Sequence, residues 1–206
     1  MFGFGPEFIF KIPGLLLALT VHEYAHARAA VWLGDHTPKT EGRLTLNPIA
    51  HLDPFGLIML CISNFGWAKP VNVNFYNLKD FRKGLFYVSL AGPFANFLMA
   101  FLSLLIMVLL YKMHFLSTEV YKVLQASYQL NLSLCLFNLL PIPPLDGSKM
   151  LMSILPDKYA YYLQNMEQYG AFILMALVVT HALNPILGPL VGLLDIIIQS
   201  LVSLFI

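Results

Sequence analysis

The chain has 206 residues, of which 58% are hydrophobic and 11% are charged, whereas an ordinary soluble domain carries about 25% charged residues. This composition indicates an integral membrane protein. The formal net charge of +1 gives no reason to expect a nucleic-acid partner, so the positions of the charges are more informative than their sum.

Long apolar stretches predict the first two membrane segments. One runs over residues 12–33, where Gly34 and Asp35 form a helix stop signal, and Glu23 is its only acidic residue. The next covers residues 84–111, carries no charge, and exceeds the ~20 residues that a bilayer requires. Both stretches are therefore predicted to be transmembrane helices.

Three further apolar segments follow. Residues 123–145 are uncharged, but the prolines of "LPIPPL" break a helix near Leu140. A fourth span, within residues 168–184, ends near the prolines of "NPILGP". A separate apolar helix over residues 186–206 comes last, and the sequence leaves open whether it crosses the membrane or lies along its surface.

The loop between the first two spans holds two unusual pieces. Residues 54–68 are apolar but too short for an ordinary span, which predicts a re-entrant or interfacial segment. Residues 69–74 alternate polar and β-branched side chains in the manner of a short strand. We therefore predict an all-α membrane protein, a polytopic bundle of about four to six transmembrane helices with a short re-entrant or β-hairpin element in this loop.

The basic residues predict the orientation of the bundle. By the positive-inside rule, the loop over residues 28–83 and the end of the third span lie in the cytoplasm, and the N-terminus lies outside. The ends of the first and third spans then share one side, so their polar residues can meet. The inner side carries Arg28, Lys39, Arg43, Lys69, Lys79, Arg82, Lys83, Lys149 and Lys158, and the outer side carries Lys11, Lys112 and Lys122.

The first span contains the sequence "HEYAH", an HExxH motif. His22 and His26 are four residues apart, so on a helix they share a face and both imidazoles can reach one zinc ion, with Glu23 beside them. Ionisable residues at bilayer depth are costly and indicate a functional site. The alternative is a chance set of polar residues at a helix contact. A catalytic zinc takes three protein ligands, so a third must come from elsewhere.

Asp146 is the best candidate for that third ligand. It follows the prolines that end the third span, and Gly147 permits a tight turn that returns the carboxylate toward the bilayer. Considered alone, this stretch would be an ordinary Asp-Gly turn at a helix end. Asp53 is the next candidate, and His51 with Asp53 forms an alternative metal pair, although the surrounding residues favour a loop-structuring role.

Three separated motifs, in this order, resemble the site-2 protease family of intramembrane zinc metalloproteases. They are "HEYAH" (residues 22–26), "AGPFAN" (residues 91–96) and "NLLPIPPLDG" (residues 138–147). The loop sequences "HLDPFG" and "GWAKPVNVN" are similar to that family too, so the resemblance covers residues 12–150. It implies a single protease domain over residues 1–206, with the catalytic core in that range and C-terminal apolar helices over residues 168–206.

The resemblance also implies roles for individual residues. His22, His26 and Asp146 would hold one zinc ion per chain, and Glu23 would be the general base. The chain departs from the family where Gly147 is followed by Ser148 rather than by a second glycine. We find no PDZ-like insertion and no nucleotide-sensing domain, so we expect a minimal form.

Two asparagines carry weaker predictions. Asn96 and Asn138 would line the site in the family, where they could stabilise an oxyanion or bind the substrate backbone. From the residues alone, an asparagine in a membrane helix equally serves to hydrogen-bond a neighbouring helix.

The function expected from these features is zinc-dependent endopeptidase cleavage of transmembrane segments in membrane-protein substrates, within the lipid bilayer of a prokaryotic plasma membrane and with the site open to the cytoplasm. A substrate helix must unwind before cleavage, and Lys69, Val71 and Val73 form the candidate edge that would hold it extended. A zinc transporter would carry ligands along a path on several helices. A non-proteolytic adaptor would lack Glu23 or one of the ligands.

Overall fold

The computed structural model describes residues 7–63 and 66–205, and within these ranges the chain is built from helices without a named strand. The prediction of an all-α membrane protein is confirmed. The α-helices are α1 (Phe8–Leu33), α2 (Thr37–Thr40), α3 (Pro54–Ser63), α4 (Phe81–Lys112), α5 (Thr118–Asn138), α6 (Asp146–Ile154), α7 (Asp157–Val179) and α8 (Asn184–Ser203), with short 3-10 turns at Pro48–His51 and Phe75–Asn77.

Three of the described helices, α1, α4 and α8, are long and apolar enough to cross a membrane. They make the protein a multi-pass membrane protein. The C-terminal segment, whose placement the sequence left open, thus has the length and composition of a span. The helices at the other two predicted spans, α5 and α7, are less apolar, and α7 begins well before the predicted segment because Pro156 precedes its first turn.

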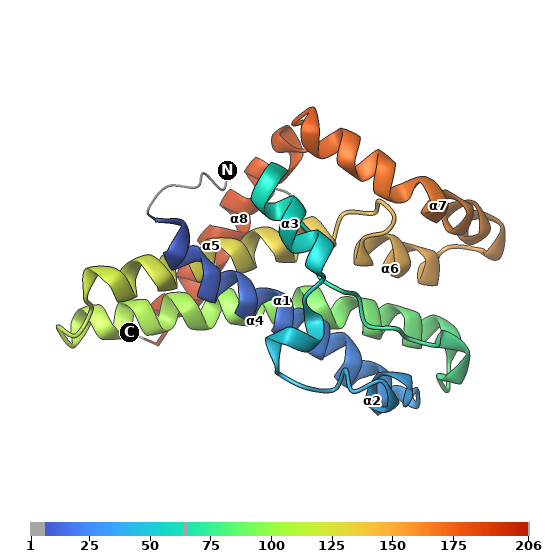
Figure 1. The fold of residues 1–206 in the computed structure, drawn as a ribbon, viewed down its shortest axis with the longest axis horizontal. Helices are drawn as coiled ribbons and strands as arrows, with labels where there is room; N and C mark the ends of the chain where they lie inside the picture. The colour runs from blue at the N-terminus through green and yellow to red at the C-terminus, as the bar shows by residue number, and fades with distance from the viewer. Residues whose placement is uncertain (1–6, 64–65, 206) are drawn as a thin grey trace.

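The centre of the bundle is formed by α1, α4 and α5, which pack against one another, while α6 packs on α4 and α8 packs on α4 and α5. Figure 1 shows α4 and α5 side by side along the long axis, with α7 set apart at the edge of the molecule. Small residues permit the close approach, since a Cβ on Gly14 would lie 2.8 Å from the Cα of Ser127. The largest apolar cluster joins α4, α5 and α8 through Ala100, Leu104, Tyr128, Leu132, Ile198 and Val202.

The loop between α1 and α4 runs past the middle of the bundle. We refer to residues 69–77 as the site loop. The structure corrects the prediction of a strand over residues 69–74, because this stretch is extended but joins no ladder among the described residues. Its alternation is retained, since Val71 and Val73 are half-buried and their neighbours Asn72 and Asn74 are exposed. A single antiparallel bridge joins Leu52 and Ala68.

Asp35 ties the site loop to the end of α1. Its carboxylate is fully buried and accepts hydrogen bonds from the backbone N–H of Asn74 at 2.8 Å and the side-chain amide of Asn77 at 2.9 Å. It also accepts bonds from the hydroxyl and backbone N–H of Thr37, at 2.6 and 3.1 Å. The residue predicted as a helix stop therefore anchors the loop that borders the site.

The turn after α5 places Asp146 at the first position of α6. The peptide bond between Pro143 and Pro144 is cis, and a Cβ on Gly147 would lie 2.2 Å from the carbonyl oxygen of Leu139. Only glycine permits that approach. The predicted helix break near Leu140 is observed, since α5 ends at Asn138 and the chain turns back toward the bundle.

Candidate active site

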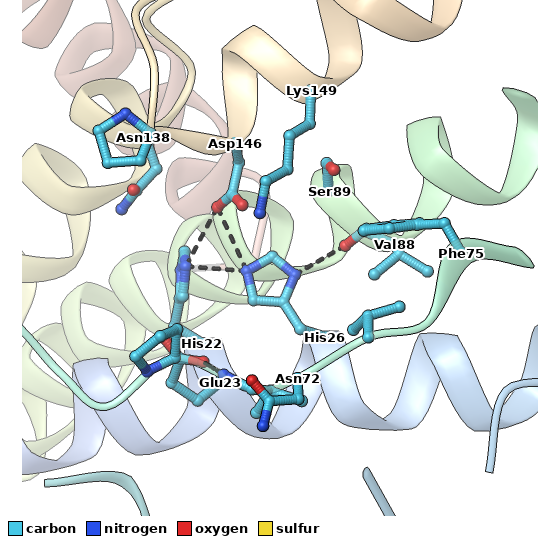
Figure 2. Close-up of a pocket in the computed structure, with 14 residues that line it drawn as sticks. His22, Glu23, His26, Asn72, Phe75, Val88, Ser89, Asn138, Asp146 and Lys149 are labelled. Atoms are coloured by element: carbon cyan, nitrogen blue, oxygen red, sulfur yellow. Dashed lines mark hydrogen bonds and ion pairs between the residues drawn. The ribbon is translucent and has the colours of Figure 1, made fainter. Parts of the chain in front are cut away.

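Two helices bring three metal-ligating side chains together. The Nε2 atoms of His22 and His26, both on α1, are 3.0 Å apart. Each lies 3.2 Å from Oδ2 of Asp146 on α6. Figure 2 shows the two rings and the carboxylate converging on one point. Ligand atoms about 2.0–2.1 Å from a tetrahedral ion are about 3.3 Å apart, so this spacing suits a zinc ion.

The hydrogen bonds of the imidazoles point to a cation at this position. Nδ1 of His22 donates to Oδ1 of Asn96 at 2.6 Å, and Nδ1 of His26 donates to the carbonyl oxygen of Val88 at 2.7 Å. In neutral rings both Nε2 atoms are then acceptors. They face an acceptor, the buried Oδ2 of Asp146, which has no hydrogen-bond donor among the described residues. A positive ion among three acceptor atoms satisfies all of them, so these residues fit a metal.

A chain of amide hydrogen bonds orients His22. Asn96 is fully buried, and its Nδ2 donates to the carbonyl of Ala18 at 3.1 Å and to Oδ1 of Asn131 at 2.9 Å, which leaves its Oδ1 for the histidine. Asn131 donates in turn to the carbonyl of Ser127 at 2.9 Å. Partners of this kind hold a ligand in the required tautomer and ring orientation.

Gly92 lets α4 press directly against the two histidines. A Cβ at this position would lie 2.3 Å from Nε2 of His26 and 2.7 Å from Nε2 of His22. Neither ring can retreat, because each is held by its Nδ1 hydrogen bond. The glycine of the "AGPFAN" motif is therefore required by packing against the site.

Glu23 lies in the same cavity as the three converging side chains. The cavity has a volume of about 380 Å³. Glu23 is largely buried, and its Oε2 accepts a hydrogen bond from the backbone N–H of Val71 at 2.9 Å. The other lining residues are His22, His26, Pro70, Val71, Asn72, Val73, Phe75, Val88, Ser89, Asn138, Pro144, Asp146 and Lys149.

The residues predicted for substrate binding fall into two groups. Asn138, Val71 and Val73 line the cavity. Asn96 lies behind His22 and does not line it, and the side chain of Lys69 is exposed on the loop outside the cavity.

The alternative metal pair is engaged in loop structure. Nε2 of His51 bonds to the carbonyl of Thr45 at 2.8 Å, and Oδ1 of Asp53 accepts from the backbone N–H of Gly56 at 2.9 Å. In the part of the chain that the structure describes, metal-ligating side chains gather in threes only at His22, His26 and Asp146. A transporter would require further such groups along a path.

Several residues of the site were not predicted from the sequence. Lys149 lies one helical turn after Asp146 and lines the cavity, and its i+3 spacing could have shown this. Asn131 is a polar residue in an apolar stretch, and that signal could have identified it. Ser89 lines the cavity with a buried hydroxyl that has no partner in the described residues, and no sequence pattern indicated it.

A buried HExxH motif whose two histidines lie beside an aspartate, within a helical membrane protein, is characteristic of membrane zinc metalloproteases. Residues 108–181 match the model of Peptidase family M50, a range that includes Asn138 and Asp146. No solved structure gives a significant match to this chain.

Relatives match most of the chain. It is 42% identical over 183 residues to the "Putative zinc metalloprotease YwhC" of Bacillus subtilis, covering 86% of this chain and 84% of that protein. Proteins with the same description, named Rip2, from Mycolicibacterium smegmatis and Mycobacterium tuberculosis are 35% and 34% identical, over 86% of this chain and 69% of each relative. This chain belongs to peptidase family M50, the site-2 protease family of zinc metalloproteases, as its motifs predicted.

Proposed function

We propose that this protein is an intramembrane endopeptidase that hydrolyses peptide bonds in the transmembrane segments of membrane-protein substrates. The observation that carries the proposal is the convergence of His22, His26 and Asp146 beside Glu23 in one cavity of a bundle whose α1 and α4 can span a membrane. The bacterial relatives and the basic residues of the loop over residues 28–83 support a plasma-membrane protein whose site opens to the cytoplasm.

His22, His26 and Asp146 would hold one zinc ion. When bound, zinc polarises a scissile carbonyl and makes a water molecule a strong nucleophile at neutral pH. The protein contributes the geometry, since Asn96 and the carbonyl of Val88 fix both rings with Nε2 directed at the third ligand.

Glu23 is the general base in this mechanism. Its carboxylate lines the cavity next to the two histidines, and it is not one of the three converging groups. It takes the proton of the attacking water and delivers it to the nitrogen of the leaving amine. The hydrogen bond from Val71 holds Oε2 in place, and Oε1, which no described residue hydrogen-bonds, is the oxygen that takes the proton.

The site loop supplies a backbone edge for the substrate. A helix cannot be cut while its carbonyls are held in helical hydrogen bonds, so the substrate must be extended at the scissile bond. The extended residues Val71 and Val73 line the cavity and can pair with such a chain by β-addition. Within the part of the chain that the structure describes, the side chain of Asn138 hydrogen-bonds only Leu134 of its own helix, so its amide oxygen is available to the substrate.

Four variants separate metal binding from chemistry. His22→Ala, His26→Ala and Asp146→Ala each remove a ligand and are expected to lose zinc and activity. Glu23→Gln keeps the shape of the side chain but cannot take a proton, so it is expected to keep zinc and lose about 10²–10⁴ in rate. Elemental analysis of detergent-purified protein, beside cleavage of a transmembrane peptide in vesicles, measures both.

Glu41→Gln is the matched control for Glu23→Gln, because Glu41 lies outside the cavity and only accepts hydrogen bonds from Asn72. It should keep zinc and activity. Full zinc and activity in Asp146→Ala would remove Asp146 from the site, and normal cleavage by Glu23→Gln would refute the hydrolytic mechanism.

A further inference from the structure

A second, larger cavity adjoins the proposed active site. It has a volume of about 600 Å³ and lies between the start of α4, α6 and the first half of α7. Phe75 and Lys149 line both cavities, so these two side chains form the boundary that the cavities share. We refer to the second cavity as the α7 groove.

The walls of the α7 groove suit an apolar side chain. Leu85 and Phe81 from α4 face Met152 from α6, and Ala160 and Tyr161 come from α7. Four charged residues also line it, Arg82, Lys149, Asp157 and Glu167, and two of them, Arg82 and Asp157, form an ion pair at 2.6 Å. An open, largely apolar cavity with a few polar groups is the usual form of a ligand site.

The site loop leads from one cavity into the other. Its residues Val71 and Val73 line the active-site cavity, and Phe75, two residues further on, lines both cavities. Successive residues of an extended chain advance about 3.3 Å. A substrate that pairs with Val71 and Val73 therefore reaches the α7 groove within two or three residues of the cleavage point.

Lys149 stands at the junction with a free ammonium group. Its side chain forms no ion pair with a carboxylate in the described residues, and Figure 2 shows it extending from α6 into the active-site cavity. An extended chain at this point offers backbone carbonyls, which an ammonium can bind as hydrogen-bond acceptors. The junction thus has one polar group for the substrate backbone and apolar walls for its side chain.

We propose that the α7 groove is a substrate subsite, which takes one large apolar side chain of the unwound substrate, two or three residues to one side of the scissile bond. This inference rests on the proposed protease function, and it locates one determinant of substrate specificity in the α7 groove. A subsite of this kind discriminates between side chains by their volume.

The test introduces a bulky side chain into the α7 groove and measures which residues the protease then prefers near the cleavage point. The probe is a set of synthetic transmembrane peptides in phosphatidylethanolamine–phosphatidylglycerol vesicles, randomised around a central helix-breaking pair, with products identified by mass spectrometry. Ala160→Trp places an indole in the groove. Ala171→Trp, on an exposed position of the same helix outside the groove, is the matched control.

The unmodified protein is expected to prefer leucine or phenylalanine at one peptide position. Ala160→Trp should lower cleavage of those peptides by about 10- to 200-fold, while peptides with glycine or alanine there are cut as before. Ala171→Trp should keep the original preference. Met152→Ala enlarges the groove and should shift the preference toward larger side chains, which guards against a folding defect in the tryptophan variant.

Binding of the same peptides provides a second readout. With Glu23→Gln added to each variant, fluorescence anisotropy should show the same loss of affinity for peptides with a large residue at that position. Unchanged preferences in both Ala160→Trp and Met152→Ala would overturn the subsite and leave the protease intact. If the unmodified protein cut no peptide, the proposed function would fail, and the subsite with it.

Discussion

The two halves of the bundle are held by different forces. Around the site, α1, α4 and α5 are joined by buried amide and imidazole hydrogen bonds through Asn96 and Asn131. Close packing adds to this, since Gly14 lies against the backbone of Ser127 and Gly92 against the two histidine rings. In α7 and α8 few residues are buried, namely Gly170 and Leu174 in α7 and Ile198 and Val202 in α8, and most of the exposed side chains are apolar. The first half depends on specific geometry, and the second depends on apolar surface.

The strongest test of this difference is Gly92→Ala. The new methyl group would lie within 2.3 Å of Nε2 of His26, and overpacking of this kind displaces neighbours. We expect the variant to retain little zinc and no measurable cleavage. Elemental analysis and the vesicle cleavage assay measure this, and full zinc occupancy would show that the histidines are not held as the structure has them.

Asn96→Leu tests the hydrogen-bond chain behind the histidines. His22 would lose its Nδ1 acceptor, and loss of such a partner typically costs 10–100-fold in metal affinity or activity. Asn138→Leu is the control, because among the described residues its amide bonds only to Leu134 of its own helix, so zinc affinity should not change. Competition titration with a chelator measures both, and equal affinities in the two variants would contradict the role assigned to Asn96.

Asp35→Asn tests the anchor of the site loop. Burial raises the pKa of Asp35, but hydrogen bonds from Thr37, Asn77 and the backbone of Asn74 outweigh burial and hold the pKa below its ordinary value. The substitution places an N–H₂ group where donors converge, and leaving buried donors unpaired costs about 1–3 kcal/mol. Thermal unfolding in detergent at pH 7 should show the loss of stability.

The pH dependence of that loss has a definite sign. The folded pKa of Asp35 is lowered, so its carboxylate stabilises the protein above the unfolded pKa of about 3.9. This contribution disappears as the pH falls through the lower folded pKa. The stability difference between the unmodified protein and Asp35→Asn should therefore be full at pH 6 and shrink below about pH 4, whereas a constant difference would point to a cause other than the charge.

Gly192→Ala in α8 should have the smallest effect and the opposite sign. Nothing lies within 4 Å of a Cβ placed there, and alanine is preferred over glycine inside a helix by about 0.5–1 kcal/mol. We expect unchanged zinc content, unchanged cleavage and a slightly higher unfolding temperature. A loss of stability in this variant would mean that neighbouring groups pack closely around Gly192, contrary to the open space that surrounds it here.

The parts of the site that follow from local geometry could be predicted from the sequence. The four-residue spacing places His22 and His26 on one face of any helix, with Glu23 next to them. Predicting Asp146 as the third ligand required one further inference, that the first and third spans end on the same side of the membrane. Its position beside the histidines agrees with that step.

Features that depend on helix packing could not be predicted in the same way. For Asn96 the sequence left two roles open, lining the site or hydrogen-bonding a neighbouring helix. Which neighbour a buried amide meets depends on how α1, α4 and α5 pack, and here Asn96 meets His22. The alternation of residues 69–74 correctly indicated extended chain. A strand also requires a partner, and none of the described segments lies alongside to provide one. The roles of Lys69, Val71 and Val73 in binding substrate stay predictions.

The site loop is fastened to one helix on both sides of the cavity. Asp35, just beyond α1, holds Asn74 and Asn77, and Glu23 within α1 holds Val71. The third converging side chain, Asp146, belongs to α6. If α1 moved away from α6 to admit a substrate helix, Glu23 and the site loop that pairs with the substrate would move together as one rigid unit. The return of α1 to α6 would then bring the two histidines back to Asp146, with the substrate chain already paired to the site loop.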